Sequence, residues 1–151
     1  MIVVGLGKAG CNIARVFKKF PQYETYGIDV TTEADITIRK RATHEEYEKH
    51  FPSLKKKLKF SKKEVTVIIG GSGAISGASL RLLEQLQDNN LSVIYIQPDL
   101  DLLSEVQTMQ ERIVKNVLQE YARSGLLEVI YLINNGLVEQ GVGEVPKTQK
   151  R

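Results

Sequence analysis

The sequence predicts a single α/β domain with a three-layer, Rossmann-like fold, in which helices cover both faces of a mostly parallel sheet. Three observations support this prediction. Short runs rich in β-branched residues alternate along the chain with segments whose apolar residues recur every three or four positions. The strand-like runs are largely apolar, as in parallel strands that are buried on both faces. Glycine-rich segments follow two of these runs, at the points where the chain turns from a strand into a helix.

The first strand and the first helix follow directly from the amino terminus. Residues 2–4 are apolar, and Gly5 stops the strand. The helix that follows is expected to bury one face, whose apolar residues recur at i, i+3, i+4 and i+7: Ile13, Val16, Phe17 and Phe20. Pro21 ends this helix, because proline lacks the N–H group that a helix interior requires.

Two more strands are predicted over residues 25–30 and 36–38. Thr43 and Glu46 then form a capping box, which opens a helix that runs toward His50. A cluster of six lysines follows within nine residues: Lys55, Lys56, Lys57, Lys59, Lys62 and Lys63. Such a cluster is typical of a solvated helix end and loop, and it also suits an electrostatic footprint for phosphates or an acidic surface.

Residues 65–69 are nearly all β-branched and form the clearest strand of the chain. A glycine-rich segment follows, and then a helix whose inner side carries Leu82, Leu83 and Leu86. Residues 92–96 predict the next strand.

A long helix is predicted to begin near Ser104, whose hydroxyl forms a second capping box with Gln107. Gly125 is its natural carboxyl-terminal stop. Its apolar face is expected to consist of Val106, Met109, Ile113, Val117 and Tyr121. Residues 129–133 form the last predicted strand.

Composition restricts the setting in which this domain works. The chain of 151 residues is long enough for one domain with its own core. Its single cysteine, Cys11, excludes an internal disulfide and is consistent with a reducing cytoplasm, where we expect the protein. We expect no membrane span, since no apolar run approaches the required ~20 residues, and no signal peptide after Met1. Nucleic-acid recognition has little support, because aromatic residues do not interleave with the lysines.

The first glycine-rich loop matches the pattern GxGxxG and comprises Gly5, Leu6, Gly7, Lys8, Ala9 and Gly10. Glycines at such a turn let phosphate oxygens approach the backbone N–H groups, and the helix N-terminus adds a partial positive charge. Asp29 ends the second strand, where a dinucleotide fold places its ribose-binding acid. The loop therefore predicts phosphate binding; the alternative is a tight turn with no ligand.

The second glycine-rich loop follows the strand at residues 65–69 and comprises Gly70, Gly71, Ser72, Gly73, Ala74, Ile75, Ser76 and Gly77. Both loops are expected at the carboxyl edge of the sheet, where ligands of such folds bind. Two loops on one crevice suit the two ends of a triphosphate, with Ser72 and Ser76 as hydroxyl donors. Alternatively, Gly70 and Gly71 end the strand and Ser76 caps the next helix.

On these motifs the chain resembles the tubulin and FtsZ superfamily of GTPases. Residues 7–12 are similar to the family's first glycine loop, which ends in an asparagine, here Asn12. Residues 71–77 are similar to a degenerate form of the family signature GGGTGTG. The last strand leads into Asn134 and Asn135, where the family places an asparagine near the ribose and base. The match covers nearly the whole chain in order, but only the amino-terminal half of the family.

The resemblance implies a GTP-binding domain over residues 1–135, followed by a weakly structured tail over residues 136–151. Asn12 would contact the guanine, the two loops the phosphates, and Asn135 (or Asn134) the sugar. Motifs and resemblance together give sixteen candidate nucleotide-binding residues: Gly5, Gly7, Lys8, Ala9, Gly10, Cys11, Asn12, Asp29, Gly71, Ser72, Gly73, Ala74, Ile75, Ser76, Gly77 and Asn135. The ligand would be GTP or GDP, with Mg²⁺ accompanying GTP. Further sugar and base contacts in the family fall in the region of Glu105, Glu111 and Arg112.

Three departures from the family pattern bear on activity. Ser72, Ala74 and Ile75 stand where the signature has Gly, Thr and Gly. No glycine-rich loop lies between Ile36 and Lys63, where the family senses the γ-phosphate. The chain also ends before the central helix and the loop that carries the family's water-positioning acid. The resemblance thus implies a role in filament assembly or its regulation. The chain would associate with itself or with an FtsZ- or tubulin-like partner, and alone it would hydrolyse GTP weakly or not at all.

Two other functions stay open at this point. Gly5, Gly7, Gly10 and Asp29 also fit an NAD(P)-binding Rossmann domain with a redox partner, which explains the first loop better than the second. The altered signature fits a nucleotide-free interaction module.

The remaining polar residues give weaker signals. His44 and His50 are expected to be surface residues rather than zinc ligands. Cys11 is expected to be a small buried residue or a loop contact. Asp99 and Asp101 follow a predicted strand, and they suit either a solvated turn or a position near magnesium or a ribose.

Overall fold

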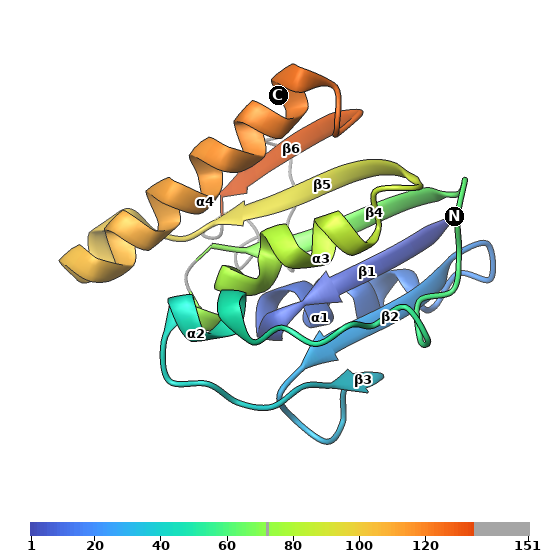
Figure 1. Cartoon of the computed structure of the whole chain (residues 1–151), viewed down its shortest axis with the longest axis horizontal. Helices are drawn as coiled ribbons and strands as arrows, with labels where there is room; N and C mark the ends of the chain where they lie inside the picture. The colour runs from blue at the N-terminus through green and yellow to red at the C-terminus, as the bar shows by residue number, and fades with distance from the viewer. Residues whose placement is uncertain (72, 135–151) are drawn as a thin grey trace.

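A computed structural model of the chain describes residues 1–71 and 73–134 (Figure 1) and confirms the α/β fold. Six strands are described: β1 (Ile2–Leu6), β2 (Glu24–Asp29), β3 (Ile36–Thr37), β4 (Glu64–Gly70), β5 (Asn90–Gln97) and β6 (Val129–Asn134). All strand pairs are parallel, and the strands lie in the order β3-β2-β1-β4-β5-β6. The helices are α1 (Gly7–Phe17), α2 (His44–Lys49), α3 (Ser79–Gln85) and α4 (Glu105–Ser124), with 3₁₀ turns η1 (Ala74–Ala78) and η2 (Leu100–Leu102).

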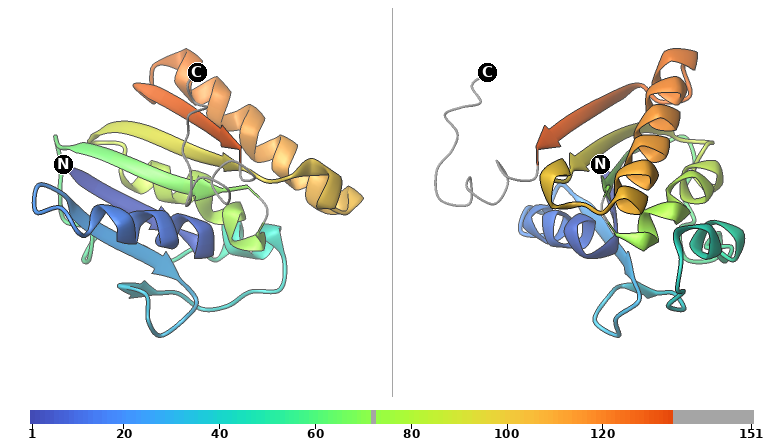
Figure 2. Two further views of the ribbon diagram at one scale, coloured as in Figure 1. Left: turned by 180° about the vertical axis from the view of Figure 1, so that it is seen from behind. Right: turned by 90° about the vertical axis from the view of Figure 1, so that its left-hand side faces the viewer.

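The helices lie on both faces of the sheet, as predicted. In the right-hand view of Figure 2, α1 lies on one side of the strands, and α2, α3 and α4 lie on the other. The chain leaves β1 through α1 toward β2, whereas it leaves β4 through α3 toward β5 on the other side of the sheet. Right-handed crossovers in opposite directions place their helices on opposite faces. The direction of winding therefore reverses between the neighbouring strands β1 and β4.

Each face has its own core. The larger one joins the inner faces of β1, β4 and β5 to α2, α3 and α4, and Leu82, Leu83 and Leu86 are all buried in it, as predicted. The smaller one lies under α1 and consists of Val3, Ala14, Ile68 and Ile96. Full burial of one such aliphatic side chain stabilises the fold by about 1.5–3 kcal/mol.

The predicted inner face of α4 is wrong in its amino-terminal half, although Tyr121, also predicted, does pack against the core. Val106, Met109 and Ile113 are 64%, 62% and 51% exposed. The helix turns a different side toward the sheet and buries Glu111, Val114 and Leu118 instead. Both sets recur at helical spacing, so periodicity alone cannot distinguish them.

The predicted inner face of α1 is also partly wrong. Val16 and Phe20 are about half exposed, and Phe20 lies beyond the end of the helix at Phe17 rather than within it. The side that meets the sheet is made of small residues: Gly7, Gly10, Cys11 and Ala14. Small residues let a helix backbone approach the strands closely, and here that close approach determines which side faces inward.

The predicted helix ends are largely confirmed. The Ser104 hydroxyl accepts from the Gln107 N–H at 3.1 Å, and the Gln107 side chain accepts from the Ser104 N–H at 3.0 Å. Gly125 ends α4 in the left-handed region, with φ +91°. Thr43 caps α2, but the Glu46 carboxylate accepts from the Ala42 N–H rather than from that of Thr43. Within the described part of the chain, no helix is both long enough and apolar enough to cross a membrane.

Candidate functional site between the two glycine loops

Two glycines of the first loop are required by backbone packing. A Cβ atom on Gly5 would lie 2.3 Å from the carbonyl oxygen of Gly10. A Cβ atom on Gly10 would lie 2.5 Å from the carbonyl oxygen of Ile68 in β4. The backbone of α1 therefore rests directly on β1 and β4, without a layer of side chains between them.

The middle of the first loop starts α1 with an open N-terminus. Gly7 adopts φ +78°, which other residues reach only with strain. Leu6, at the N-cap, provides no side-chain cap, and the first turn contains no acidic residue. The first N–H groups of the helix therefore face the carboxyl edge of the sheet without a capping side chain, which is the arrangement that binds anions. Lys8 is exposed at this turn, and Ala9 is half-buried.

The second loop is held by the sheet below it and by α2 beside it. A Cβ atom on Gly71 would lie 2.1 Å from the Tyr95 hydroxyl, and one on Gly77 would lie 2.1 Å from the His44 carbonyl oxygen. The Ser76 hydroxyl donates to the carbonyl oxygen of Gly73 at 2.7 Å. Ser76 therefore closes the turn η1 from within and does not cap α3, whose N-cap is Ala78.

The two loops meet at Ile75. A Cβ atom on Gly7 would lie 2.8 Å from Cγ2 of Ile75, so this methyl group fills the space above the first loop. Gly73 is exposed and has more room: its Cβ atom would lie 3.8 Å from the same methyl group, and Ala74 beside it is half-buried. The structure thus brings the two predicted loops together, with an isoleucine at their contact where the family signature has glycine.

The other candidate residues lie around this contact. Asn12 is exposed, and its Oδ1 atom accepts a hydrogen bond from Arg15 at 2.7 Å. Asp29 ends β2 and Asn134 ends β6, both on the carboxyl edge. Asp29 ends the strand next to β1, whereas β5 separates β6 from β4. Asn134 therefore lies farther than Asp29 from the place where the two loops meet. Ser72 and Asn135, also predicted here, lie outside the described residues, as does the predicted tail.

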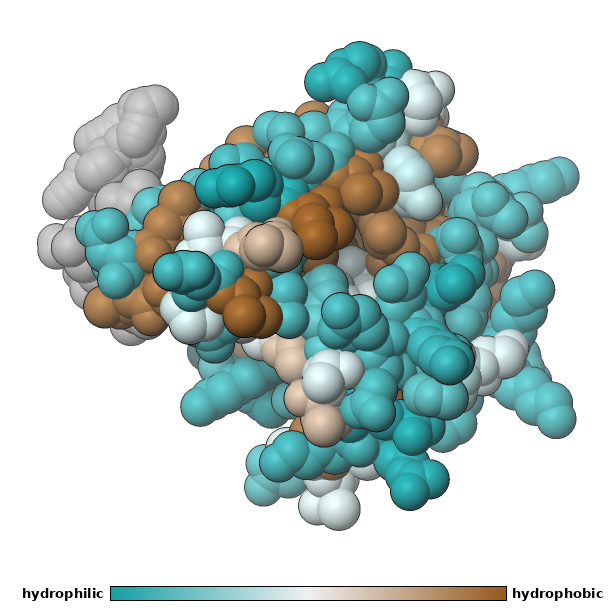
Figure 3. Space-filling view, turned by 60° about the vertical axis from the view of Figure 1, so that its left-hand side comes forward, coloured by the Kyte–Doolittle hydropathy of each residue, from teal (hydrophilic) through white to brown (hydrophobic). Residues whose placement is uncertain are grey.

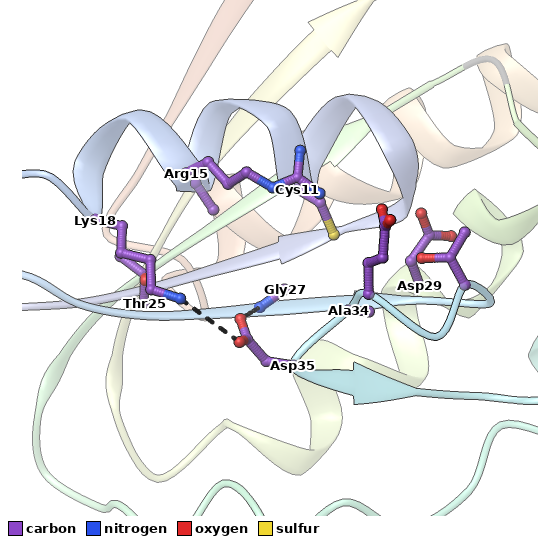
Figure 4. Close-up of a pocket in the computed structure, with 11 residues that line it drawn as sticks. Cys11, Arg15, Lys18, Thr25, Gly27, Asp29, Ala34 and Asp35 are labelled. Atoms are coloured by element: carbon purple, nitrogen blue, oxygen red, sulfur yellow. Dashed lines mark hydrogen bonds and ion pairs between the residues drawn. The ribbon is translucent and has the colours of Figure 1, made fainter.

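A pocket of about 130 Å³ opens between α1 and β2 (Figure 4). Cys11 and Arg15 of α1 line one side, and Asp29 and Asp35 line the other. The Asp35 carboxylate accepts from the Gly27 N–H at 2.7 Å and lies 3.8 Å from the Lys18 ammonium group. Asp29 therefore borders a hollow that runs along α1, and none of residues 5–10 of the first loop lines this hollow.

Cys11 is buried and poorly suited to be a nucleophile. Its Sγ atom lies 3.5 Å from the carbonyl oxygen of Ile28 and 3.7 Å from that of Gly5. Burial, with the nearby Asp29 carboxylate adding to it, raises the pKa of the thiol to about 11. A reactive cysteine needs a lowered pKa, so the thiol serves as a small packing group, in line with its prediction as a buried residue.

We expect iodoacetamide to alkylate Cys11 in the folded chain at pH 8 at least roughly a hundredfold more slowly than in the urea-unfolded chain, because the folded thiolate fraction is that much lower. Mass spectrometry of timed samples measures both rates. Since the unfolded thiol titrates near 9.0 and the folded one near 11, the stability that this group contributes is lost as the pH rises through that interval. Equal rates in the two states would contradict the burial of Cys11.

The second loop rests on a buried hydrogen bond that no sequence motif indicates. The fully buried Tyr95 hydroxyl donates to Oε2 of Glu111 at 3.0 Å, and Glu111 is 4% exposed. Burial, and then Glu111, raise the pKa of Tyr95. Glu111 thus faces the core rather than a sugar or base. Glu111 precedes Val114 by three residues and Leu118 by seven. This helical spacing was the sequence feature that could have placed Glu111 on the buried side of α4.

Other polar residues have local roles. His50 is exposed, but His44 is half-buried against the second loop, so its prediction as a surface residue is wrong; burial lowers its pKa. Asp99 accepts from the Asp101 N–H at 3.1 Å and caps η2. Residues 1–71 and 73–134 contain no group of three metal-ligating side chains.

Comparisons of the chain with protein-family models, with curated proteins and with solved structures found no match.

Proposed function

We propose that the chain binds the phosphates of a nucleotide in the crevice between its two glycine loops. The observation that carries the proposal is their place in the sheet. They follow β1 and β4, which are neighbours, and the helices that come after them lie on opposite faces. In open parallel sheets this reversal leaves a crevice outside the carboxyl ends of the strands, and ligands bind there.

The first loop supplies the stronger anion site. The uncapped N–H groups of α1 and the exposed Lys8 would hold phosphate oxygens. Gly73, exposed and unobstructed, would let the far end of the phosphate chain approach the second loop. A Mg²⁺ ion would offset the charge of the phosphates, and its ligands would be mainly phosphate oxygens and water. Asp99, in the turn after β5, is the candidate carboxylate ligand.

GTP is the nucleotide that we favour, on the family resemblance. Asn12 of α1 would contact its base, and Asn134 at the end of β6, or Asn135, would contact its sugar. By the same resemblance, bound GTP would serve filament assembly or its regulation, and the chain alone would hydrolyse it weakly or not at all.

A dinucleotide is the second candidate, because Asp29 ends β2, the strand next to β1, and borders the pocket between α1 and β2. In this alternative Asp29 would bind a ribose hydroxyl of NAD(P), and a separate partner would exchange the hydride.

Calorimetric titration of the chain with GTP, GDP, ATP and NADH, each with Mg²⁺, tests these proposals. We expect a micromolar Kd for GTP, which is typical of a nucleotide site with several phosphate contacts. Gly73→Val should raise this Kd at least tenfold and leave the unfolding midpoint unchanged, since the backbone at Gly73 (φ −84°, ψ 154°) accepts any residue.

Three outcomes separate the interpretations. Loss of GTP preference over ATP in Asn12→Ala supports the guanine contact. Binding of NADH that depends on Asp29 would replace GTP by the dinucleotide. No binding of any of the four would leave a nucleotide-free interaction module, with Ile75 closing the crevice.

A further inference from the structure

The amino-terminal half of α4 carries an apolar stripe that faces no other described element. Leu102 just before the helix is 80% exposed, and Val106, Met109 and Ile113 are each more than half exposed. None of residues 105–110 is buried. Figure 1 shows this end of α4 extending past the ends of the strands, and Figure 3 shows a band of apolar side chains between hydrophilic ones on this side of the molecule. Contiguous exposed apolar patches of several hundred Å² mark interaction sites.

The spacing of the stripe suits packing against another helix. Within α4 its members Val106, Met109 and Ile113 follow one another at intervals of three and four residues, which is the heptad spacing of an interhelical seam. From Val106 to Ile113 the seam runs for two turns, or about 10 Å.

The charges beside the stripe indicate the partner. Three acids lie at its start, Asp99, Asp101 and Glu105, whereas Arg112 and Lys115 lie at its other end. Glu105 and Arg112 are exposed. An antiparallel copy of the same helix would place Val106 opposite Met109 of the partner subunit. The same alignment sets Glu105 beside Arg112 of the partner subunit, twice across the two-fold axis. Such self-complementarity is what a two-fold interface requires.

We propose that two copies of this chain pair through α4 as an antiparallel, two-fold dimer. The apolar stripe forms the seam, and the acidic start of each helix faces the basic part of the other. A parallel pair would place like charges together and is disfavoured. This closed pairing is distinct from a head-to-tail filament and does not depend on nucleotide binding.

Sedimentation velocity over a series of concentrations tests the pairing. We expect the unmodified chain to form dimers and no larger species, and Met109→Glu to be monomeric. Val16→Glu is the matched control, because Val16 is 52% exposed on α1, on the other face of the sheet, and should leave the dimer intact. Circular dichroism of each variant verifies that the fold is retained.

Charge exchange tests the antiparallel register. Glu105→Arg and Arg112→Glu should each raise the dimer Kd at least tenfold, since each places like charges together, and the double variant should return it to within about threefold of the original. A monomeric unmodified chain at about 0.1 mM, an open-ended series of oligomers, or a dimer indifferent to Met109→Glu would overturn the proposal. A double variant whose dimer Kd stays as high as those of the single variants would overturn the antiparallel register.

Discussion

Replacing Gly10 with alanine is expected to lower the free energy of unfolding by about 3 kcal/mol, the upper range of overpacking. The new methyl group would lie 2.5 Å from the backbone oxygen of Ile68, in the central strand β4. A side chain could rotate away, but a strand carbonyl cannot, so α1 must move off the sheet. For a domain of this size, thermal unfolding should shift down by roughly 6–12 °C.

Gly73→Ala is the control for this experiment. It adds the same methyl group to the other glycine loop, but the nearest atom would lie 3.8 Å away and the backbone is extended. Its stability should stay within about 0.5 kcal/mol of the original. Equal unfolding midpoints for the two variants would show that α1 does not rest on β4 as the structure has it.

Tyr95→Phe is expected to lower the free energy of unfolding by about 2–3 kcal/mol, because it leaves the buried Glu111 side chain without its hydrogen-bond donor. Urea denaturation followed by circular dichroism measures the loss. Tyr131→Phe removes the same hydroxyl from a tyrosine that is 54% exposed on β6, and it should change stability by less than about 0.5 kcal/mol.

A double-mutant cycle assigns this loss to the pair. Glu111→Leu alone leaves the Tyr95 hydroxyl unpaired, and Tyr95→Phe with Glu111→Leu removes both polar groups. The double variant should therefore be more stable than the sum of the two single losses indicates. Strict additivity would mean that the two side chains do not interact.

The elements that depend on nearby residues were predicted well. The capping box at Ser104 and the stop at Gly125 are local signals, and both are present. The strand over residues 65–69 was predicted from its β-branched residues, and it is the centre of β4. β5 begins at Asn90, two residues before the predicted start, because Asn90 pairs with Glu64 at the amino-terminal ends of the two strands.

The features that depend on distant residues were not predicted. On α1, periodicity favoured the larger apolar side chains, but the glycine contacts with β1 and β4 turn the small residues inward. On α4, two apolar sets compete, and only the position of β5 and β6 decides between them. The hydrogen bond between Tyr95 and Glu111 joins residues of a strand and a helix, which no local pattern pairs.

Of the candidate site, the structure tests only the position of the two glycine loops. Glycine loops after two strands indicated a shared crevice, and the neighbouring positions of β1 and β4 confirm that the loops meet. The sequence did show isoleucine in place of a signature glycine, but only the fold shows that Ile75 lies against Gly7. The internal hydrogen bond of Ser76 likewise depends on the turn η1, which no motif indicated.

The contact of α1 with the strands has a consequence for the dynamics of the crevice. Because Gly5, Gly10 and Ile68 meet backbone to backbone, no change of rotamer can loosen that contact. Amide hydrogens of β1 and of the second turn of α1 should therefore exchange with solvent only when the domain unfolds globally. In the proposed function, the first loop would therefore lose almost no conformational entropy when a nucleotide binds. Any adjustment to the shape of that nucleotide would have to come from the second loop.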